Sequence, residues 1–411
     1  MLATSEQMHV VKSGASDIVP EAELAKKLDR GRPIVVKLGV DPTAPDLHLG
    51  HAVPLRKLRQ FQDLGHEVVL IIGDFTALIG DPSGRSSTRP ALTREEIEDN
   101  AQTYIDQAFK ILDPERTTMR RNSEWLAELD FGQVLRLTSQ FTVARILERD
   151  DFANRYRDGV GISLHELLYP MAQAYDSVAI EADVEIGGTD QLFNLLAGRE
   201  LMGKLGMEPQ VCLTLPLLEG TDGVQKMSKS YGNYVGLTDD QAEMFGRVMS
   251  IPDDLMVKYY RLCTGLPVDE VDAIEKGLAE GSLHPNQTKR QLARTIVALY
   301  HGDGASSEAE AAFDRVFKEQ EAPSDIPTFE VGDAHAWIDD DRTVYVPGFL
   351  AEAGVAASGT AARQFIDDGA VKRDGQQLDP KQYSVPWEDF IGKKWQVGRR
   401  KWVRPTRTGK D

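Results

Sequence analysis

The sequence has little cysteine and no long apolar run. Only two cysteines occur among 411 residues, Cys212 and Cys263, with neither metal-ligand spacing nor a disulfide framework. No stretch approaches the roughly 20 consecutive apolar residues that a membrane helix needs. Residues 1–19 lack the basic start and apolar run of an export signal. We therefore expect a soluble protein in a reducing, cytoplasmic compartment, with no membrane partner and no metal site of its own.

Positive charge is also scarce over most of the chain. The sequence has 47 Lys and Arg residues against 65 Asp and Glu residues, a formal net charge of -18. Such a balance lowers the expectation of a nucleic-acid partner. The basic residues gather near the end, at Lys393, Lys394, Arg399, Arg400, Lys401, Arg404, Arg407 and Lys410. An acidic body with a basic tail would suit a local contact with RNA, although a tail that only aids solubility fits equally well.

The first half of the chain predicts a doubly wound α/β domain. Residues 34–40 (IVVKLGV) and 67–73 (EVVLIIG) are mostly apolar and β-branched without alternation, typical of buried strands, and a helical pattern lies between them at 48–64. Strand, helix and strand at this spacing predict a βαβ unit of a parallel sheet. Thr93 and Glu96 form a capping box for a helix that continues to Leu112. The later elements are expected at 164–175 (helix), 179–186 (strand), 190–205 (helix) and 211–217 (strand).

The chain is long for one domain, and we divide it into four segments. They are a Rossmann-like domain at 1–235 with a helical insertion at about 120–165, a helical domain at 236–321, a linker at 322–344, and a small α+β unit at 345–411. Within the last unit, helices are expected at 346–353 and 360–368. Asp374-Gly375 predicts a hairpin turn, and 395–403 predicts two strands around Gly398.

A His-Leu-Gly-His motif begins the first predicted crossover helix. His48 and His51 lie where free backbone N–H groups and the helix dipole favour an anion, so both could donate hydrogen bonds to the phosphates of ATP. Gly50 would let an adenine ring approach the backbone. A histidine pair at a helix start can equally be a cap or part of the core, so this motif alone decides little.

The second motif is Lys-Met-Ser-Lys-Ser, in a loop after the last predicted strand. Lys226 and Lys229 could move onto the negative charge that develops on a departing pyrophosphate. An isolated pair of lysines would more simply be an exposed basic loop. Together with the histidine motif on a doubly wound sheet, however, the full pentapeptide closely resembles the class I aminoacyl-tRNA synthetases.

Three further motifs resemble one family of that class, the tyrosyl-tRNA synthetases, over about residues 30–235. Tyr169, Gln173 and Asp176 fall on one helical face at i, i+4 and i+7. Residues 187–191 (GGTDQ) join a strand to a helix, and 80–84 (GDPSG) follow the second strand. The intact KMSKS motif with GGTDQ is similar to a second bacterial branch of the family.

The resemblance implies a role for each matching position. Asp176 would accept a hydrogen bond from the phenol of tyrosine. The amino-acid end of tyrosine would be bound by Tyr169, Gln173, Asp81 and Gln191. Adenosine would be bound by Gly39, Asp41, Gly50, Gly188, Asp190, Met227 and Ser228. The phosphates and the departing pyrophosphate would be bound by Thr43, His48, His51, Arg85, Arg89, Lys226 and Lys229.

Two positions depart from the better-known bacterial enzymes of the family. Lys37 stands where those enzymes have a tyrosine that faces the substrate phenol, and Leu38 replaces a cysteine that faces the ribose. Lys37 could donate a hydrogen bond to the phenol, and we count it among the candidate substrate-binding residues. It could equally point away from the pocket. The sequence leaves both alternatives open.

The C-terminal unit resembles a small RNA-binding domain shared with a ribosomal protein. The likeness lies in 358–375, and Arg363, Lys372 and Arg373 are the expected RNA contacts. Three tryptophans of this unit, at positions 387, 395 and 402, could stack on RNA bases or form the core of the unit. The helical segment at 236–321 would be the anticodon-binding domain.

The resemblance also implies partners and substrates. They are L-tyrosine, ATP with Mg²⁺, tRNA(Tyr) and a second copy of the chain, with the 120–165 insertion at the dimer interface. No protein-bound cofactor is expected. Two alternatives remain: another adenylate-forming enzyme, above all a tryptophanyl-tRNA synthetase, and a synthetase-derived RNA-binding protein. The intact His48, His51, Lys226 and Lys229 argue against lost catalysis.

Overall fold

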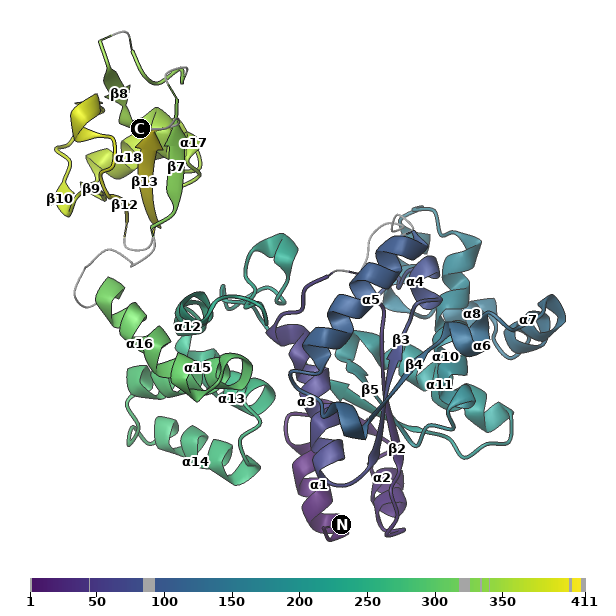
Figure 1. The fold of residues 1–411 in the computed structure, drawn as a ribbon. Helices are drawn as coiled ribbons and strands as arrows, with labels where there is room; N and C mark the ends of the chain where they lie inside the picture. Colours follow the sequence, from purple (N-terminus) through teal and green to yellow (C-terminus); the bar gives the residue numbers. More distant parts are fainter. Residues whose placement is uncertain are drawn as a thin grey trace. The chain divides into compact units, whose positions relative to one another are not determined.

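The computed structural model of the chain describes residues 2–43, 45–83, 93–317, 326–332, 335–339, 341–398 and 401–407. The chain forms two compact units, residues 1–306 and 307–411. Figure 1 shows the larger unit as a sheet with helices on both faces and a helical part, and the smaller unit as short strands around two helices. Among the described residues, no helix is long and apolar enough to cross a membrane.

The larger unit is built on a six-stranded sheet in the order β1-β6-β5-β2-β3-β4. Its strands are β1 (Asp17–Val19), β2 (Val35–Val40), β3 (Glu67–Ile72), β4 (Thr117–Arg121), β5 (Val184–Gly188) and β6 (Val211–Leu215). All neighbours are parallel except β1, which pairs antiparallel with β6. The predicted α/β doubly wound fold is confirmed. Strand order reverses between β2 and β5, and ligands of such sheets bind at the carboxyl ends of the strands at this point.

Helices cover both faces of this sheet. The helix α3 (Leu49–Asp63) joins β2 to β3 on one face, whereas α10 (Tyr169–Ala179) and α11 (Leu192–Lys204) lie on the other face (Figure 1). The helix α5 (Arg94–Ala108) begins with the predicted capping box, since the Thr93 side chain accepts from the Glu96 backbone N–H. The remaining helices of this part are α1 (Thr4–Lys12), α2 (Glu21–Leu28) and α4 (Thr76–Ile79).

Residues between β4 and α10 form the predicted helical insertion. It consists of α6 (Ser123–Leu126), α7 (Phe131–Thr138), α8 (Val143–Ile146) and α9 (Asp150–Arg157). Leu137 of α7 packs in one apolar cluster with Met171 of α10 and Leu201 of α11. The insertion is therefore attached to the two helices that flank the sheet.

A helical segment follows the sheet. It contains α12 (Gln241–Met249), α13 (Met256–Cys263), α14 (Val268–Ala279), α15 (Pro285–His301) and α16 (Asp303–Phe317). Buried Tyr260 of α13 donates a 2.8 Å hydrogen bond to the carbonyl of Thr288 in α15. The helix α13 also packs against α3, which joins this helical part to the α/β part within the larger unit.

The smaller unit has a five-stranded sheet in the order β10-β9-β12-β13-β7 and a two-stranded sheet of β11 and β8. Its elements are β7 (Thr328–Val331), β8 (Thr343–Tyr345), α17 (Val346–Glu352), α18 (Gly359–Asp367), β9 (Val371–Arg373), β10 (Gln376–Gln377), β11 (Ser384–Pro386), β12 (Trp395–Val397) and β13 (Lys401–Arg407). Trp395 and Phe349 lie in its apolar core, and Asp374-Gly375 forms the predicted hairpin turn between β9 and β10.

One segment of the predicted organisation needs correction. The range 322–344 was expected to be a linker, but β7 pairs in parallel with β13, and Trp337 is buried in the core of the smaller unit. These residues are part of the folded unit because their side chains and backbone are needed to complete its sheet and core. Residues 318–325, where the linker was best marked by sequence, lie outside the described residues.

Candidate active site

A divided cleft opens at the carboxyl ends of β2 and β5. Its first part, the carboxylate lobe, has a volume of about 320 Å³ and contains Asp41, Asp81 and Asp176. Its second part, the histidine lobe, has a volume of about 560 Å³ and contains His48 together with the Lys226–Lys229 loop. Both lobes share the residues Gly39, Val40, Asp41, Thr43, His51, Gly187, Asp190 and Gln191. A bound molecule can therefore extend from one lobe into the other.

Asp176 is the most deeply placed acid of the carboxylate lobe. Only 3% of its surface is exposed, and it accepts hydrogen bonds from Trp125 Nε1 at 2.8 Å and Asn122 Nδ2 at 3.4 Å. Burial raises the pKa of Asp176 to about 7, while the charge of Lys37 and these two donors act in the opposite direction. The carboxylate is thus held by fixed donors yet still lines the cavity, where a hydroxyl group could reach it.

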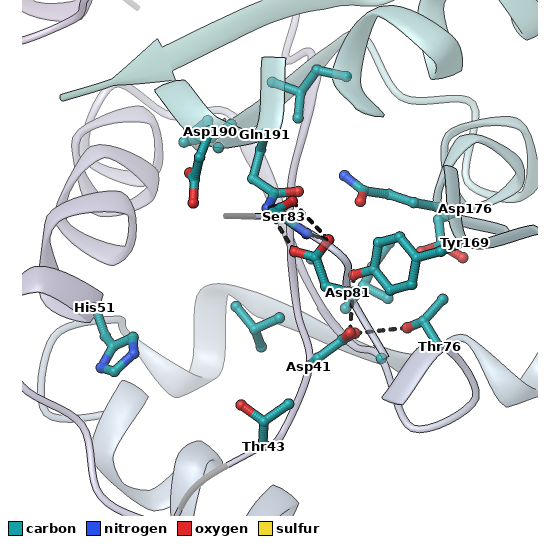
Figure 2. A pocket seen from close by; sticks show the side chains of 18 residues that line it. Asp41, Thr43, His51, Thr76, Asp81, Ser83, Tyr169, Asp176, Asp190 and Gln191 are labelled. Atoms are coloured by element: carbon teal, nitrogen blue, oxygen red, sulfur yellow. Dashed lines mark hydrogen bonds between the residues drawn. The ribbon is translucent and has the colours of Figure 1, made fainter. Parts of the chain in front are cut away.

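Asp41 is a second acid, partly buried, on the wall that both lobes share. It accepts hydrogen bonds from Thr76 Oγ1 at 2.7 Å and Tyr169 Oη at 2.9 Å (Figure 2). Burial raises the pKa of Asp41 to about 7, although the hydrogen bond from Thr76 opposes this shift. Asp41, the residue after β2, therefore orients the phenol of Tyr169.

Asp81 and Gln191 close the cavity from two different segments. Gln191 Nε2 donates to Asp81 Oδ2 at 2.8 Å, and the Ser83 backbone N–H donates to Asp81 Oδ1 at 2.9 Å (Figure 2). Arg149, from the insertion, reaches Asp81 with its Nη2 atom at 3.0 Å and Asn194 with its Nη1 atom at 2.9 Å. Arg149 is a residue that sequence reasoning missed, because a single arginine in a helical insertion carries no motif.

The helical face predicted for Tyr169, Gln173 and Asp176 is present, since all three line the carboxylate lobe. Gln173 Nε2 donates to Glu185 Oε1 at 3.1 Å. When an amide N–H group donates to a carboxylate, the carbonyl oxygen of the same amide can still accept a hydrogen bond. Glu185, in β5 and 1% exposed, was not predicted as a site residue.

Lys37 is placed differently from the substrate-contact prediction. Its ammonium group is 2.9 Å from Glu185 Oε1, its side chain is fully buried, and it lines neither lobe. In this structure Lys37 is therefore placed against Glu185, behind the residues that line the cavity. The cause is local, because Lys37 and Glu185 are paired neighbours on β2 and β5.

The histidine lobe begins at the N-terminus of α3. The rings of His48 and His51 stack with centroids 3.8 Å apart, and His51 Nδ1 accepts from the backbone N–H of His48. Burial lowers the pKa of His48 to about 3 and that of His51 to about 4, so both rings are neutral at pH 7. A Cβ atom on Gly50 would lie 3.0 Å from the His48 ring, so this close approach favours glycine. With its Nδ1 accepting, His51 carries its proton on Nε2 and can donate from that atom.

The lysine loop lies on the far side of this lobe. Asn233 fixes the loop: its Oδ1 accepts from the backbone N–H of Ser228 at 2.8 Å and its Nδ2 donates to the carbonyl of Lys226 at 3.2 Å. Lys229 Nζ donates to Asp46 Oδ2 at 2.5 Å. The loop therefore brings Lys226, Met227, Ser228 and Lys229 to the same cavity as the two histidines.

Most predicted site residues meet in this one cleft. Those that line it are Gly39, Asp41, Thr43, His48, Gly50, His51, Asp81, Tyr169, Gln173, Asp176, Gly188, Asp190, Gln191, Lys226, Met227, Ser228 and Lys229. Arg85 and Arg89 lie outside the described residues. Within the described part of the chain, no group of three or more His, Cys, Asp or Glu residues could hold a metal ion.

The predicted RNA contacts belong to the smaller unit. The Arg363 guanidinium lies 5.5 Å from the ring of Tyr345 and 5.8 Å from that of Tyr383. Arg373 is 3.5 Å from a carboxylate oxygen of Asp389, and Lys372 precedes it in β9. Trp395 is fully buried and Trp402 is 7% exposed, so these two tryptophans are core residues. Trp387 is only partly buried and packs against the core.

Sequence comparison assigns this cleft to a known family. The family model described as tRNA synthetases class I (W and Y) matches residues 29–318. The chain belongs to this family. Residues 29–318 include every residue that lines the cleft, and the match covers more than half of the chain.

Curated relatives within this class I synthetase family are similar over nearly their whole length. Tyrosine–tRNA ligase of Moorella thermoacetica is 50% identical over 404 residues, 97% of this chain and 95% of that protein. The proteins of the same name from Oleidesulfovibrio alaskensis and Thermotoga maritima are 50% and 48% identical and each covers 97–98% of this chain.

Solved synthetase structures share the fold. A C-terminally truncated mitochondrial tyrosyl-tRNA synthetase of Aspergillus nidulans has a TM-score of 0.64 at 23% identity and covers 77% of this chain and 95% of its own. The tyrosyl-tRNA synthetase of Archaeoglobus fulgidus complexed with L-tyrosine has a TM-score of 0.61 at 22% identity and covers 74% of this chain and 99% of its own. At these identities the likeness supports the arrangement of strands and helices and nothing finer.

Proposed function

We propose that the protein is a tyrosine–tRNA ligase that activates L-tyrosine with ATP and transfers the tyrosyl group to the 3′ end of tRNA(Tyr). Relatives of that name are about half identical over nearly the whole chain. The observation that carries the proposal is Asp176, a buried acid that lines the carboxylate lobe next to the two motifs of the histidine lobe. A buried acceptor that needs a hydroxyl donor disfavours amino acids without one.

Tyrosine would lie in the carboxylate lobe. Its phenol would donate to Asp176, and its ammonium group would be bound by Asp81 and the Gln173 carbonyl oxygen, with Tyr169 beside them. Gln191, which spans both lobes, would orient the tyrosine carboxylate toward the histidine lobe. An acid and a neutral carbonyl are suitable partners for a cation that leaves water.

ATP would lie in the histidine lobe and enter as its magnesium complex. Gly39, Asp41, Gly50, Gly188, Asp190, Met227 and Ser228 would surround the adenosine. One tyrosine carboxylate oxygen attacks the α-phosphorus, the new P–O bond forms, and the bond to pyrophosphate breaks. The carboxylate is already ionised, so no general base is needed, and catalysis consists of positioning and charge stabilisation.

Stabilisation of the departing pyrophosphate would come from the motif residues. His51 and His48, neutral at pH 7, can act as hydrogen-bond donors, and Thr43 lies on the wall shared by both lobes. Lys226 and Lys229 supply positive charge from the loop, and Lys229 would exchange Asp46 for phosphate oxygens. Arg85 and Arg89 are proposed to assist in the same step by family resemblance.

Binding of tRNA would involve the segments beyond the sheet. We assign anticodon recognition to the helical segment 236–321 and a further RNA contact to the C-terminal unit, through Arg363, Lys372 and Arg373. Guanidinium groups next to aromatic rings, as at Arg363 and Tyr345, are suited to unpaired bases and phosphates. A function in translation would place the protein in the cytoplasm.

A homodimer is the proposed assembly. Six of the fifteen exposed large hydrophobic side chains among the described residues lie in the insertion, between residues 131 and 164. Phe131 and Leu135 share one face of α7 and are 78% and 54% exposed. Such a concentration in one insertion suggests a protein contact, which a second copy of the chain would cover.

The test is ATP–pyrophosphate exchange with each of the twenty amino acids in turn. Exchange with tyrosine alone is expected. Exchange with tryptophan instead would keep the reaction and the fold but contradict the role given to Asp176. No exchange with any amino acid, from protein that binds ATP, would favour the synthetase-derived RNA-binding alternative.

A further inference from the structure

We propose that Lys37 and Glu185 are positioning residues of the tyrosine site: Glu185 orients the amide of Gln173, and Lys37 places a positive charge beside Asp176. The inference rests on the proposed function, because Gln173 and Asp176 are assigned there to the two ends of tyrosine. Neither Lys37 nor Glu185 lines the cleft, so both would act from behind its wall.

The two residues form a pair that the sheet itself imposes. Lys37 of β2 and Glu185 of β5 are direct partners in the parallel register, so their side chains leave the sheet on the same face. The Lys37 Nζ atom is 2.9 Å from Glu185 Oε1, with side chains 0% and 1% exposed. Ions removed from water at such depth are tolerated only when they are well paired.

Glu185 accepts hydrogen bonds from three more side chains. Gln173 Nε2 donates at 3.1 Å and Ser177 Oγ at 3.3 Å, both from successive turns of α10, and Gln210 Nε2 donates from the residue before β6. A Cβ atom at Gly198 of α11 would lie 2.7 Å from Gln210 Nε2 and 3.3 Å from Glu185 Oε2. The absence of a side chain at Gly198 is thus what allows α11 to approach this network.

The network fixes which end of the Gln173 amide faces the cleft. Because the Nε2 atom is bound to Glu185, the Oε1 atom is the one that remains for a ligand. A carbonyl oxygen accepts from an ammonium group, whereas an amide N–H would repel it. Removal of the negative charge at Glu185 would let the amide rotate and present the wrong atom.

Lys37 acts on the other end of the substrate. Trp125 and Asn122 are neutral donors to Asp176, and the charges of Lys37 on β2 and Glu185 on β5 also act on it. Asp41, at the end of β2, is an acid whose own pKa is raised by the charge of Asp176. Burial and the charge of Glu185 oppose the ionised form of Asp176, whereas the charge of Lys37 favours it. Lys37 therefore favours the carboxylate that the substrate phenol needs, although it does not touch the phenol.

The decisive experiment is steady-state exchange kinetics of Lys37→Met between pH 6 and 9. We expect the KM for tyrosine to rise and the midpoint of its pH dependence to move upward, with KM for ATP unchanged. Loss of the Lys37 charge removes a cause that lowers the pKa of Asp176, so a smaller fraction of this carboxyl group is ionised at pH 7 and KM should rise roughly fivefold. Raising the pH to 9 should restore most of the loss.

A matched control is a second buried ion pair. Lys27 of α2 pairs with Asp183, the residue before β5, at 2.7 Å; its side chain is 2% exposed, and neither residue lines the cleft. Lys27→Met should cost stability without moving the pH midpoint for tyrosine. If Lys37→Met does not fold, Lys37→Gln removes the positive charge but keeps a hydrogen-bond donor for Glu185, and the upward shift is expected there too.

The outcomes separate the two proposals. Absence of tyrosine-dependent exchange in the unsubstituted protein would overturn the proposed function. Normal exchange in that protein, with an unshifted pH midpoint in the folded Lys37 variants, would overturn the positioning role alone. An equal shift in the Lys27 control would also overturn it, since the effect would then follow from any lost ion pair.

Discussion

The carboxyl group of Asp176 is expected to select tyrosine over phenylalanine. The substitution Asp176→Ala removes an acceptor that only tyrosine can use. A hydrogen bond to a charged group contributes about 1.5–3 kcal/mol, so kcat/KM for tyrosine should fall roughly 10- to 100-fold while that for phenylalanine stays nearly constant. Pyrophosphate exchange with both amino acids measures the ratio. An unchanged ratio in a folded variant would remove Asp176 from the recognition of the phenol.

The ionisation of the same residue predicts a pH dependence. Burial raises the pKa of Asp176 to about 7, so the carboxylate that accepts from the phenol is present above this pH and lost below it. We expect kcat/KM for tyrosine to rise from pH 6 to pH 8, with a fall of roughly fivefold between pH 7 and pH 6. The histidines do not contribute, because burial holds their pKa values at about 3 and 4. A profile that is flat from pH 6 to 8 contradicts this assignment.

Individual site residues were predictable where a motif carried them. His48, His51 and the Lys226–Lys229 loop are recognisable in the sequence, and the structure brings them to one lobe. Arg149 and Glu185 were not predictable, because their importance comes from partners far away in the sequence. In the sequence, Glu185 is one polar residue in an otherwise apolar strand, and only the strand register shows that it is paired with Lys37.

At the level of elements, the lysine loop depends on Asn233. This side chain is 3% exposed and bonds the backbone of Ser228, Gln225 and Lys226. Asn233→Ala should lower kcat for exchange about tenfold, because each lost hydrogen bond is worth about 1 kcal/mol and the lysines become less well positioned. KM for tyrosine should not change, since Asn233 does not line the carboxylate lobe.

Val224 provides the control for that substitution. It lies near the same loop, but its side chain is 77% exposed. The variant Val224→Ala should therefore keep the kcat of the unsubstituted protein. Equal kcat values for the two variants would show that the bonds of Asn233 do not hold the lysines in their working position.

The central elements of the sheet were predictable and its edges were not. The strands β2 and β3 are largely buried, so they appear as mostly apolar stretches without alternation in the sequence. The edge strands β1 and β4 are short and partly exposed, with the sequences DIV and TTMRR, and carry no such signal. They become strands because β6 and β3 offer unpaired backbone groups, a tertiary effect that local sequence does not encode.

At the level of the whole molecule, the exposed side chains of α7 predict a dimer. The double variant Phe131→Glu, Leu135→Glu places charge on the face expected to meet the second copy. Because unpaired charges are costly to bury, we expect the dimer to dissociate to monomers at micromolar concentration, as measured by sedimentation velocity.

Val224→Glu is the matched control for association. It introduces a charge at an equally exposed apolar position outside the insertion, and it should leave the mass unchanged. An unsubstituted protein that sediments as a monomer would contradict the dimer itself. A double variant that remains dimeric would place the interface elsewhere.

The order of the segments could be predicted from composition, whereas the residue at which the smaller unit begins could not. The apolar residues of β7 and Trp337 precede the predicted start of that unit at residue 345 and complete its sheet and core. The strand β7 pairs with β13, which lies at the other end of the same unit in the sequence. The sequence around β7, taken alone, resembles a linker. Its role emerges only when β13 is in place beside it.

The carboxyl groups of Asp41 and Asp176 in the cleft both have pKa values raised to about 7, so we expect the protein without ligand to carry a fraction of a proton on each at neutral pH. A ligand that binds only the ionised form of Asp176 must displace this fraction of a proton into the solvent when it binds. The heat of tyrosine binding at pH 7 will then include the heat with which the buffer takes up the proton. Calorimetric titrations in phosphate and in Tris should therefore give different apparent enthalpies for the same affinity, and their difference counts the protons that the amino acid displaces.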